Sequence, residues 1–197
     1  MNEAIDILKH TLNRWVELTP DEWSSYQKGL QVCRFERGKL ITRPGEIENH
    51  VYFVTSGIVK IYFIHGEREI CVDFAFRHDL VNSFISFATQ KPSILALEAL
   101  TPVETLCMTY SDVTRFHDFS KNSERLGRLL MEQLYIRKSL KEMTLLSQTA
   151  EERYLDLLIR HPEVVRQIPV KDIASYLGIH PESLSRIRKK MMMLAKS

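Results

Sequence analysis

The stretch VKDIASYLGIHPESLSRIRK, residues 170–189, is the most informative part of this chain. Its two halves each carry apolar residues at helical spacing, and Gly178 lies between them. Glycine tolerates the positive φ that a tight turn needs, and Ala174 is small enough for a second helix to pack closely on it. The stretch therefore predicts a helix-turn-helix.

The residues expected to hold these two helices together are apolar and lie at inward positions. They are Ile173, Leu177, Ile179, Leu184 and Ile187. Pro181 falls in the first turn of the second helix, where a missing N–H is tolerated, and His180 is then the N-cap residue.

The outward face of the second helix is polar and basic, which favours contact with double-stranded DNA. Arg186 can donate two hydrogen bonds to a guanine, and Glu182 can accept one from a cytosine. The remaining serine and basic side chains suit base edges or phosphates. The residues that we expect to contact DNA are Lys171, His180, Glu182, Ser183, Ser185, Arg186, Arg188, Lys189 and Lys190.

The charge distribution agrees with this prediction. Residues 170–197 hold six basic and two acidic side chains, which gives a net charge of +4, whereas the whole 197-residue chain carries only +2. A basic end on a nearly neutral chain is typical of a protein that meets a polyanion.

The composition, with 44% hydrophobic residues, supports a folded core rather than disorder. No apolar run approaches the roughly 18 residues needed to span a membrane. The N-terminus is amphipathic and carries acidic residues, so we expect no secretory signal and a cytoplasmic protein.

The first 110 residues show two patterns, a helical one followed by one typical of β-strands. Residues 3–18 have helical periodicity, and Thr19, Pro20 and Glu22 have the spacing that starts a second helix. From about 31 to 110, short runs rich in Val, Ile, Phe and Tyr are separated by Gly, Pro and Asn, which predicts an all-β sandwich or barrel. Cys33, Cys71 and Cys107 are far apart in the sequence, so each is expected to be a buried thiol.

A long helix is predicted over residues 122–147. A seam with alternating spacings of three and four residues runs along it, and we expect this seam to form the interface of a homodimer. Its members are Leu126, Leu129, Gln133, Ile136, Leu140 and Met143, of which only Gln133 is polar. The chain is thus predicted to be α+β, with a β domain over 1–118, a dimerisation helix over 119–147 and a small helical domain over 148–197.

In this arrangement the chain resembles the Crp/Fnr family of bacterial transcription regulators. The β part carries Gly38-Lys39-Leu40-Ile41, Pro44-Gly45-Glu46 and Ser56-Gly57-Ile58-Val59-Lys60, as in the family's cyclic-nucleotide-binding-type β-roll. The resemblance implies a double-stranded β-helix of jelly-roll type acting as a sensor domain, a homodimer along the long helix, and RNA polymerase as a further partner.

The chain departs from the family's cyclic-AMP binders at their phosphate cassette. Asn82-Ser83 stands where those relatives have Gly-Glu, and Ser93-Ile94 stands where they have an Arg pair. We therefore expect an effector pocket near Phe74, Asn82, Ser83, Ser93 and Ile94, for an unknown small molecule that is not cyclic AMP.

Two other family features are missing. The chain ends at Ser197, so no wing hairpin is expected after the second helix of the motif. The close-spaced N-terminal cysteines of the oxygen-sensing relatives are absent, so no iron–sulfur cluster is predicted. Nothing in the sequence argues for haem, and no cofactor, metal ligand or catalytic residue is predicted.

Two other functional classes stay open. One is a ligand-sensing β-roll protein that acts through protein contacts. The other is a cupin-like metal enzyme, although Tyr52 replaces the second histidine of the His-x-His pattern that begins at His50.

Overall fold

The computed structural model describes residues 2–162 and 164–194. The helices are α1 (Asn2–Asn13), α2 (Pro20–Lys28), α3 (Phe84–Thr89), α4 (Tyr110–His117), α5 (Lys121–Ser147), α6 (Ala150–Arg160), α7 (Val164–Gln167), α8 (Val170–Tyr176) and α9 (Pro181–Leu194). The strands are β1 (Gln31–Phe35), β2 (Leu40–Thr42), β3 (His50–Ser56), β4 (Val59–His65), β5 (Arg68–Ala75), β6 (Leu80–Val81), β7 (Leu95–Ala99) and β8 (Val103–Thr109).

The strands form two four-stranded antiparallel sheets, ordered β1-β8-β3-β6 and β2-β7-β4-β5. Both inner faces supply the apolar core between the sheets, which includes Val54, Val59, Leu97 and Val103. This is the jelly-roll-like β-roll that the sequence predicts, and the α+β class is confirmed.

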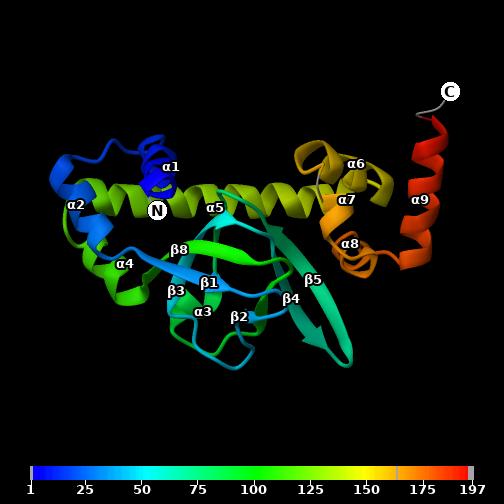
Figure 1. The fold of residues 1–197 in the computed structure, drawn as a ribbon, viewed down its shortest axis with the longest axis horizontal. Coiled ribbons are helices and arrows are strands. Elements are labelled where there is room, and N and C mark those ends of the chain that lie inside the picture. Colours follow the sequence, from blue (N-terminus) through cyan, green and yellow to red (C-terminus); the bar gives the residue numbers. More distant parts are fainter. Residues whose placement is uncertain (1, 163, 195–197) are drawn as a thin grey trace.

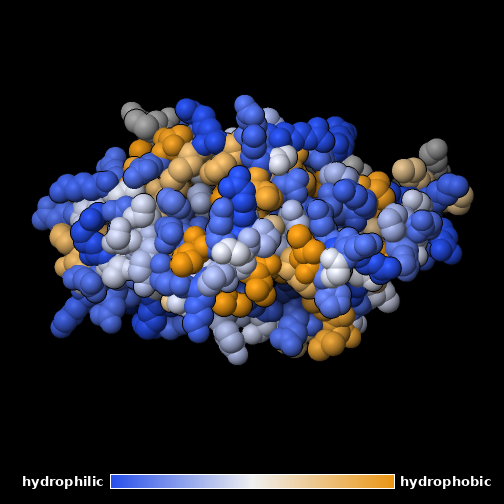
Figure 2. All heavy atoms as spheres, turned by 90° about the horizontal axis from the view of Figure 1, so that it is seen from below, coloured by the Kyte–Doolittle hydropathy of each residue, from blue (hydrophilic) through white to orange (hydrophobic). Residues whose placement is uncertain are grey.

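Helix α5 is the axis of the molecule (Figure 1). Helices α1, α2 and α4 gather at its N-terminal end, the β-roll lies along its middle, and α6 to α9 follow at its C-terminal end. Seen from below, the surface shows apolar residues only as small patches among hydrophilic ones (Figure 2). Among the described residues, no helix combines the length and apolar character needed to cross a membrane.

The N-terminal helices follow the sequence closely, with one difference. Thr19 and Glu22 form the expected capping box, and Pro20 is the first residue of α2. The first helix, however, ends at Asn13 rather than at residue 18. The Asn13 side chain accepts a hydrogen bond from the Leu18 N–H at 3.4 Å, which stabilises the turn between α1 and α2 instead of a longer helix.

The expectation of three buried thiols is wrong for two of the cysteines. Cys33 in β1 and Cys107 in β8 form a disulfide, with their Cα atoms 6.4 Å apart. The strands are antiparallel neighbours, and Cys33 is opposite Thr105, so Cys107 lies two residues along on the same face of the sheet. Cys71 is a free, buried thiol, as predicted.

Candidate nucleic-acid interface

The helix-turn-helix is present where the sequence predicts it. Helix α8 ends at Tyr176, Gly178 has a φ of +68°, and α9 begins at Pro181. The Ile179 N–H donates to the Ala174 carbonyl at 3.0 Å and closes the turn. The apolar residues at the centre of the motif have no exposed surface, and these are Ile173, Ala174, Leu177 and Leu184.

The outward face of α9 is available to a partner. Glu182, Ser185, Arg186 and Lys189 are exposed, and Ser183 is half-buried. The Ser185 hydroxyl donates to the Pro181 carbonyl at 3.1 Å. In the part of the chain that the structure describes, no carboxylate forms an ion pair with Arg186 or Lys189, so both cations are free to meet an anionic ligand.

Lys171 and His180 are also exposed, at the start of α8 and just before α9. The structure thus places the larger part of the predicted set on an accessible surface.

Two predicted phosphate contacts are engaged elsewhere. Arg188 turns toward the core of its own domain, where its Nε donates to the Tyr154 hydroxyl at 2.9 Å. Lys190 forms an ion pair with Glu151 of α6 at 2.8 Å. Both side chains therefore connect α9 to α6.

Helix α8 is attached to the β-roll by a buried ion pair that sequence analysis did not identify. Lys60 of β4 lies 2.9 Å from Asp172 and 2.6 Å from Glu69, and the Lys60 side chain is only 3% exposed. Burial alone would lower the pKa of Lys60, but its hydrogen bonds and charge interactions with Glu69 and Asp172 raise it above its ordinary value. Lys60 is therefore charged, and it links the two parts of the molecule.

A second contact reinforces this attachment. The Ser175 hydroxyl accepts a hydrogen bond from the Cys71 N–H at 2.9 Å and donates to the Glu69 carbonyl at 3.3 Å. Helix α8 therefore satisfies backbone groups at the edge of β5. Lys60, Cys71 and Asp172 are remote in sequence, and no local pattern connects them.

The predicted effector pocket is not assembled as expected. Ser83 and Ser93 are buried and share a hydrogen bond of 2.7 Å, whereas Ile94 is 70% exposed and Asn82 is half-buried. Phe74 lines a different cavity, beside α5 and α6. Two uncharged hydroxyls face each other where the resembling family's cyclic-AMP binders place a Glu and an Arg.

A buried carboxylate occupies this region. Glu48 is 3% exposed and accepts hydrogen bonds from the Thr42 hydroxyl, from the His50 N–H at 3.0 Å and from the Ser83 N–H at 3.5 Å. Its own N–H donates to the Ser86 hydroxyl at 3.0 Å. In the described part of the chain no cation is paired with Glu48, so hydroxyl and amide donors alone hold this anion. The sequence analysis did not identify Glu48, because its hydrogen-bond partners include residues that are distant in the sequence, such as Ser83 and Ser86.

The predicted dimer seam is divided into two parts. Leu126 is 1% exposed and Leu129 is partly buried, because both pack in the core that α5 shares with α1, α2 and α4. From Ile136 onward the seam is uncovered, with Ile136 at 46%, Leu140 at 58% and Met143 at 64% exposed. Leu126 thus belongs to the core of its own chain, since the N-terminal helices cover the first turns of α5.

Helix α4 crosses the N-terminal half of α5 and packs against it. A Cβ atom at Gly127 would lie 2.6 Å from His117 Nε2, so a larger residue there would require the His117 ring to move. Burial lowers the pKa of His117, which keeps the imidazole neutral at this crossing.

Comparison with known proteins defines the class. The structure of FixK2 from Bradyrhizobium japonicum is similar with a TM-score of 0.69 and 21% identity, over 84% of this chain and 86% of that one. A regulator assigned to the Crp/Fnr family from Eubacterium rectale gives 0.67 and 18%, over 91% and 86%. The Thermus thermophilus catabolite activator protein gives 0.54 and 22%, over 92% and 87%. The chain therefore has the fold of Crp/Fnr-type transcription regulators.

A family model makes the assignment of the β-roll more specific. Residues 32–118, which contain most of the β-roll, match the model of the cyclic nucleotide-binding domain. Among curated protein sequences, none matches this chain. Within the described residues, no group of three or more His, Cys, Asp or Glu side chains is arranged to hold a metal ion.

Proposed function

We propose that this protein is a DNA-binding transcription regulator of the Crp/Fnr type that recognises an inverted-repeat operator as a homodimer. The observation that carries the proposal is the exposed face of α9, on which Glu182 and Ser185 accompany Arg186 and Lys189, and neither cation has an ion pair within the described residues. Such a helix can enter a major groove and read base edges. The protein acts in the cytoplasm, and its partners are DNA, a second copy and RNA polymerase.

The uncovered half of α5 supports the homodimer. Exposed Ile136, Leu140 and Met143 form an apolar stripe that a second copy of the same helix would bury. The double variant Ile136→Asp/Leu140→Asp is expected to be monomeric by light scattering, whereas Lys138→Asp, on the opposite side of α5, leaves the dimer intact. A double variant that stays dimeric would contradict this interface.

Binding selection on random duplexes tests the DNA-binding proposal. The wild type is expected to select an inverted repeat with half-site centres about 34 Å apart, one helical turn of DNA. Arg186→Ala is expected to cost about 1–3 kcal/mol per half-site and to relax one base position. Lys189→Ala is expected to weaken all sequences alike and to reduce the salt dependence.

Lys138→Ala is the matched control, because it removes an exposed cation far from α9 and should change neither affinity nor sequence preference. A wild type that binds no duplex would instead favour a sensor that acts through protein contacts. An Arg186→Ala variant that keeps the full motif would show that another side chain reads that base.

Cyclic AMP is not the effector in this proposal. Ser83 and Ser93 offer a cyclic phosphate no charge partner, and the Glu48 carboxylate would repel it. Losing a charge-assisted phosphate contact weakens binding a hundredfold or more, on the order of several kcal/mol. Calorimetry that gives a dissociation constant below about 10 µM would contradict this part of the proposal.

A further inference from the structure

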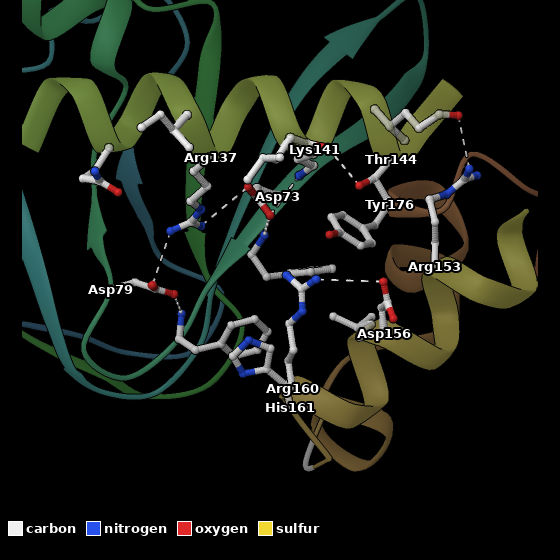
Figure 3. A pocket seen from close by; sticks show the side chains of 17 residues that line it. Asp73, Asp79, Arg137, Lys141, Thr144, Arg153, Asp156, Arg160, His161 and Tyr176 are labelled. Atoms are coloured by element: carbon white, nitrogen blue, oxygen red, sulfur yellow. Dashed lines mark hydrogen bonds and ion pairs between the residues drawn. The ribbon is translucent and has the colours of Figure 1, made fainter. Parts of the chain in front are cut away.

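A cavity of about 500 Å³ lies where the β-roll, α5, α6 and α8 meet (Figure 3). This volume is in the range of about 300–1,000 Å³ that is usual for small-molecule sites. Ser83 and Ser93 do not line it, so the cavity is separate from the region where the sequence predicted an effector.

One wall of the cavity is aromatic. Phe74 and Phe76 are 2% and 8% exposed, and the ring of Tyr176 lies 5.3 Å from that of Phe74 between centroids. The imidazole of His161 stacks on Phe76 at 3.7 Å. Burial raises the pKa of Tyr176 to about 12, so its hydroxyl is neutral and can donate a hydrogen bond. This wall suits a flat apolar group.

The charged groups of the lining have a small positive excess. The cations are Arg137, Lys141, Arg153 and Arg160, and the carboxylates are Asp73, Asp79 and Asp156. Asp73 lies 2.9 Å from Lys141 and 3.7 Å from Arg137, and Asp79 lies 3.4 Å from Arg137. Two of the three carboxylates are therefore already neutralised by cations and do not repel an anion.

Arg160 retains donors for a ligand. It extends from the end of α6 across the cavity toward α5 (Figure 3), and its side chain is 73% exposed. Among the described residues its one ion pair is with Asp156, at a long separation of 3.9 Å. The Arg153 guanidinium is engaged within its own chain, because it donates to the Gln148 carbonyl at 2.6 Å and to the Leu177 carbonyl at 2.8 Å. The arrangement is an aromatic wall with the Arg160 guanidinium beside it.

We propose that this cavity is a binding site for a small organic anion with a flat apolar body, such as an aromatic carboxylate. The ring lies against the aromatic wall and the anionic group accepts hydrogen bonds from Arg160. An occupant would touch both the β-roll and the DNA-binding part.

The consequence for regulation rests on the proposed function. In the proposed dimer, Gln133, Ile136 and Leu140 belong both to the seam and to the cavity lining, so the second copy would cover that side of the site. A ligand that contacts both parts of the chain can bias their relative position, and reciprocally DNA would change its affinity.

The test uses three probes that share one ring and differ in charge: benzoate, benzamide and benzylamine. Each is titrated into the full chain without DNA, and binding is followed by ligand-detected NMR. Benzoate is expected to bind most tightly. Arg160→Gln is expected to weaken benzoate by at least about fivefold, roughly 1 kcal/mol, and to leave benzamide unchanged.

Arg128→Gln is the matched control, because Arg128 is also an exposed arginine in an ion pair with a carboxylate four residues away, and it does not line the cavity. Equal binding of the three probes, an Arg160→Gln variant with unchanged benzoate affinity, or no binding below about 10 mM would each overturn the proposal. Because no DNA is present, this outcome is independent of the outcome of the duplex selection.

Discussion

Two buried carboxylates in this protein are held in different ways. Glu48 is 3% exposed and is surrounded by hydroxyl and amide donors of the β-roll, whereas Asp172 is 5% exposed and lies against the Lys60 ammonium. The first carboxylate stabilises loops within one domain. The second needs a cation from the β-roll, so its free energy depends on how α8 packs on the β-roll.

The comparison indicates at which of the two sites a substitution should reduce the stability of the protein more. The neutral donors that hold Glu48 all belong to the β-roll, so they stay in place wherever α8 lies. If α8 moves away, Asp172 loses its cation, whereas Lys60 keeps Glu69 of the β-roll at 2.6 Å. Changes at the two sites should therefore differ in size and in the region that they affect.

The largest effect is expected for Lys60→Met. It leaves the buried Asp172 without a cation, and the free energy of unfolding should fall by about 3–5 kcal/mol in a denaturant titration. The double variant Lys60→Met/Asp172→Leu should recover most of this loss, because the buried carboxylate of Asp172 is removed as well, and Glu69 is 46% exposed. A single variant that costs less than about 1 kcal/mol would show that the pair is effectively solvated.

Glu48→Gln should have a smaller and more local effect. The amide keeps the shape, but its NH₂ group faces the Thr42 hydroxyl and the His50 or Ser83 N–H groups, which are donors too. We expect a loss of about 1–3 kcal/mol, with faster hydrogen exchange at the His50 amide. Glu46→Gln, an exposed neighbour, should change stability by no more than about 0.5 kcal/mol, and equal effects of the two variants would contradict the role of Glu48.

Ser175→Ala examines the same contact surface as Lys60 without changing a charge. It leaves the Cys71 N–H without its acceptor at 2.9 Å, and we expect a loss of about 1–2 kcal/mol with faster exchange of that amide. Ser185→Ala, on the exposed face of α9, is the matched control and should be within about 0.5 kcal/mol of wild type. Unchanged exchange at Cys71 in Ser175→Ala would mean that α8 does not protect β5.

The smallest effect concerns alkaline pH. Burial raises the pKa of the Cys71 thiol from 9.0 to about 12. The folded protein therefore holds this proton more tightly than the unfolded chain, so the contribution to stability is complete below pH 9 and is lost as the pH rises toward 12. Over the first unit above pH 9 the loss is at most about 1.4 kcal/mol. Denaturant midpoints at successive pH values should fall less steeply in Cys71→Ala, and identical slopes would contradict this assignment.

The sequence predicts those features that are encoded locally. Gly178 and Ala174 place the turn of the helix-turn-helix, and Thr19 with Glu22 places the start of α2, because turn and capping chemistry depends on residues a few positions apart. The exposure of Arg186 also follows from helical periodicity alone. The domain boundaries at 118 and 147 and the roles of the DNA-facing side chains stay predictions.

Features that depend on tertiary structure could not be predicted from the pattern. An alternating strand pattern would place Lys60 on an outward face. Its burial results from α8, which covers it. Arg188 is predicted to contact phosphate, but in the structure it donates to the Tyr154 hydroxyl. The pairing of Cys33 with Cys107 follows from the neighbourhood of β1 and β8, which joins the two ends of the β domain and has no signature in the spacing of the cysteines.

One apolar cluster contains residues of both the β-roll and the helix-turn-helix. Phe74 and Cys71 of β5 are in the same buried group as Leu177 and Leu184 of the helix-turn-helix. The helices after α5 therefore share their core with the β-roll and are not expected to fold independently. If they were separated at the α5–α6 junction, they would expose apolar surface that the β-roll now covers. The intact chain should accordingly melt in a single cooperative transition, and exchange of its C-terminal helices for those of a relative would require matching changes in β5.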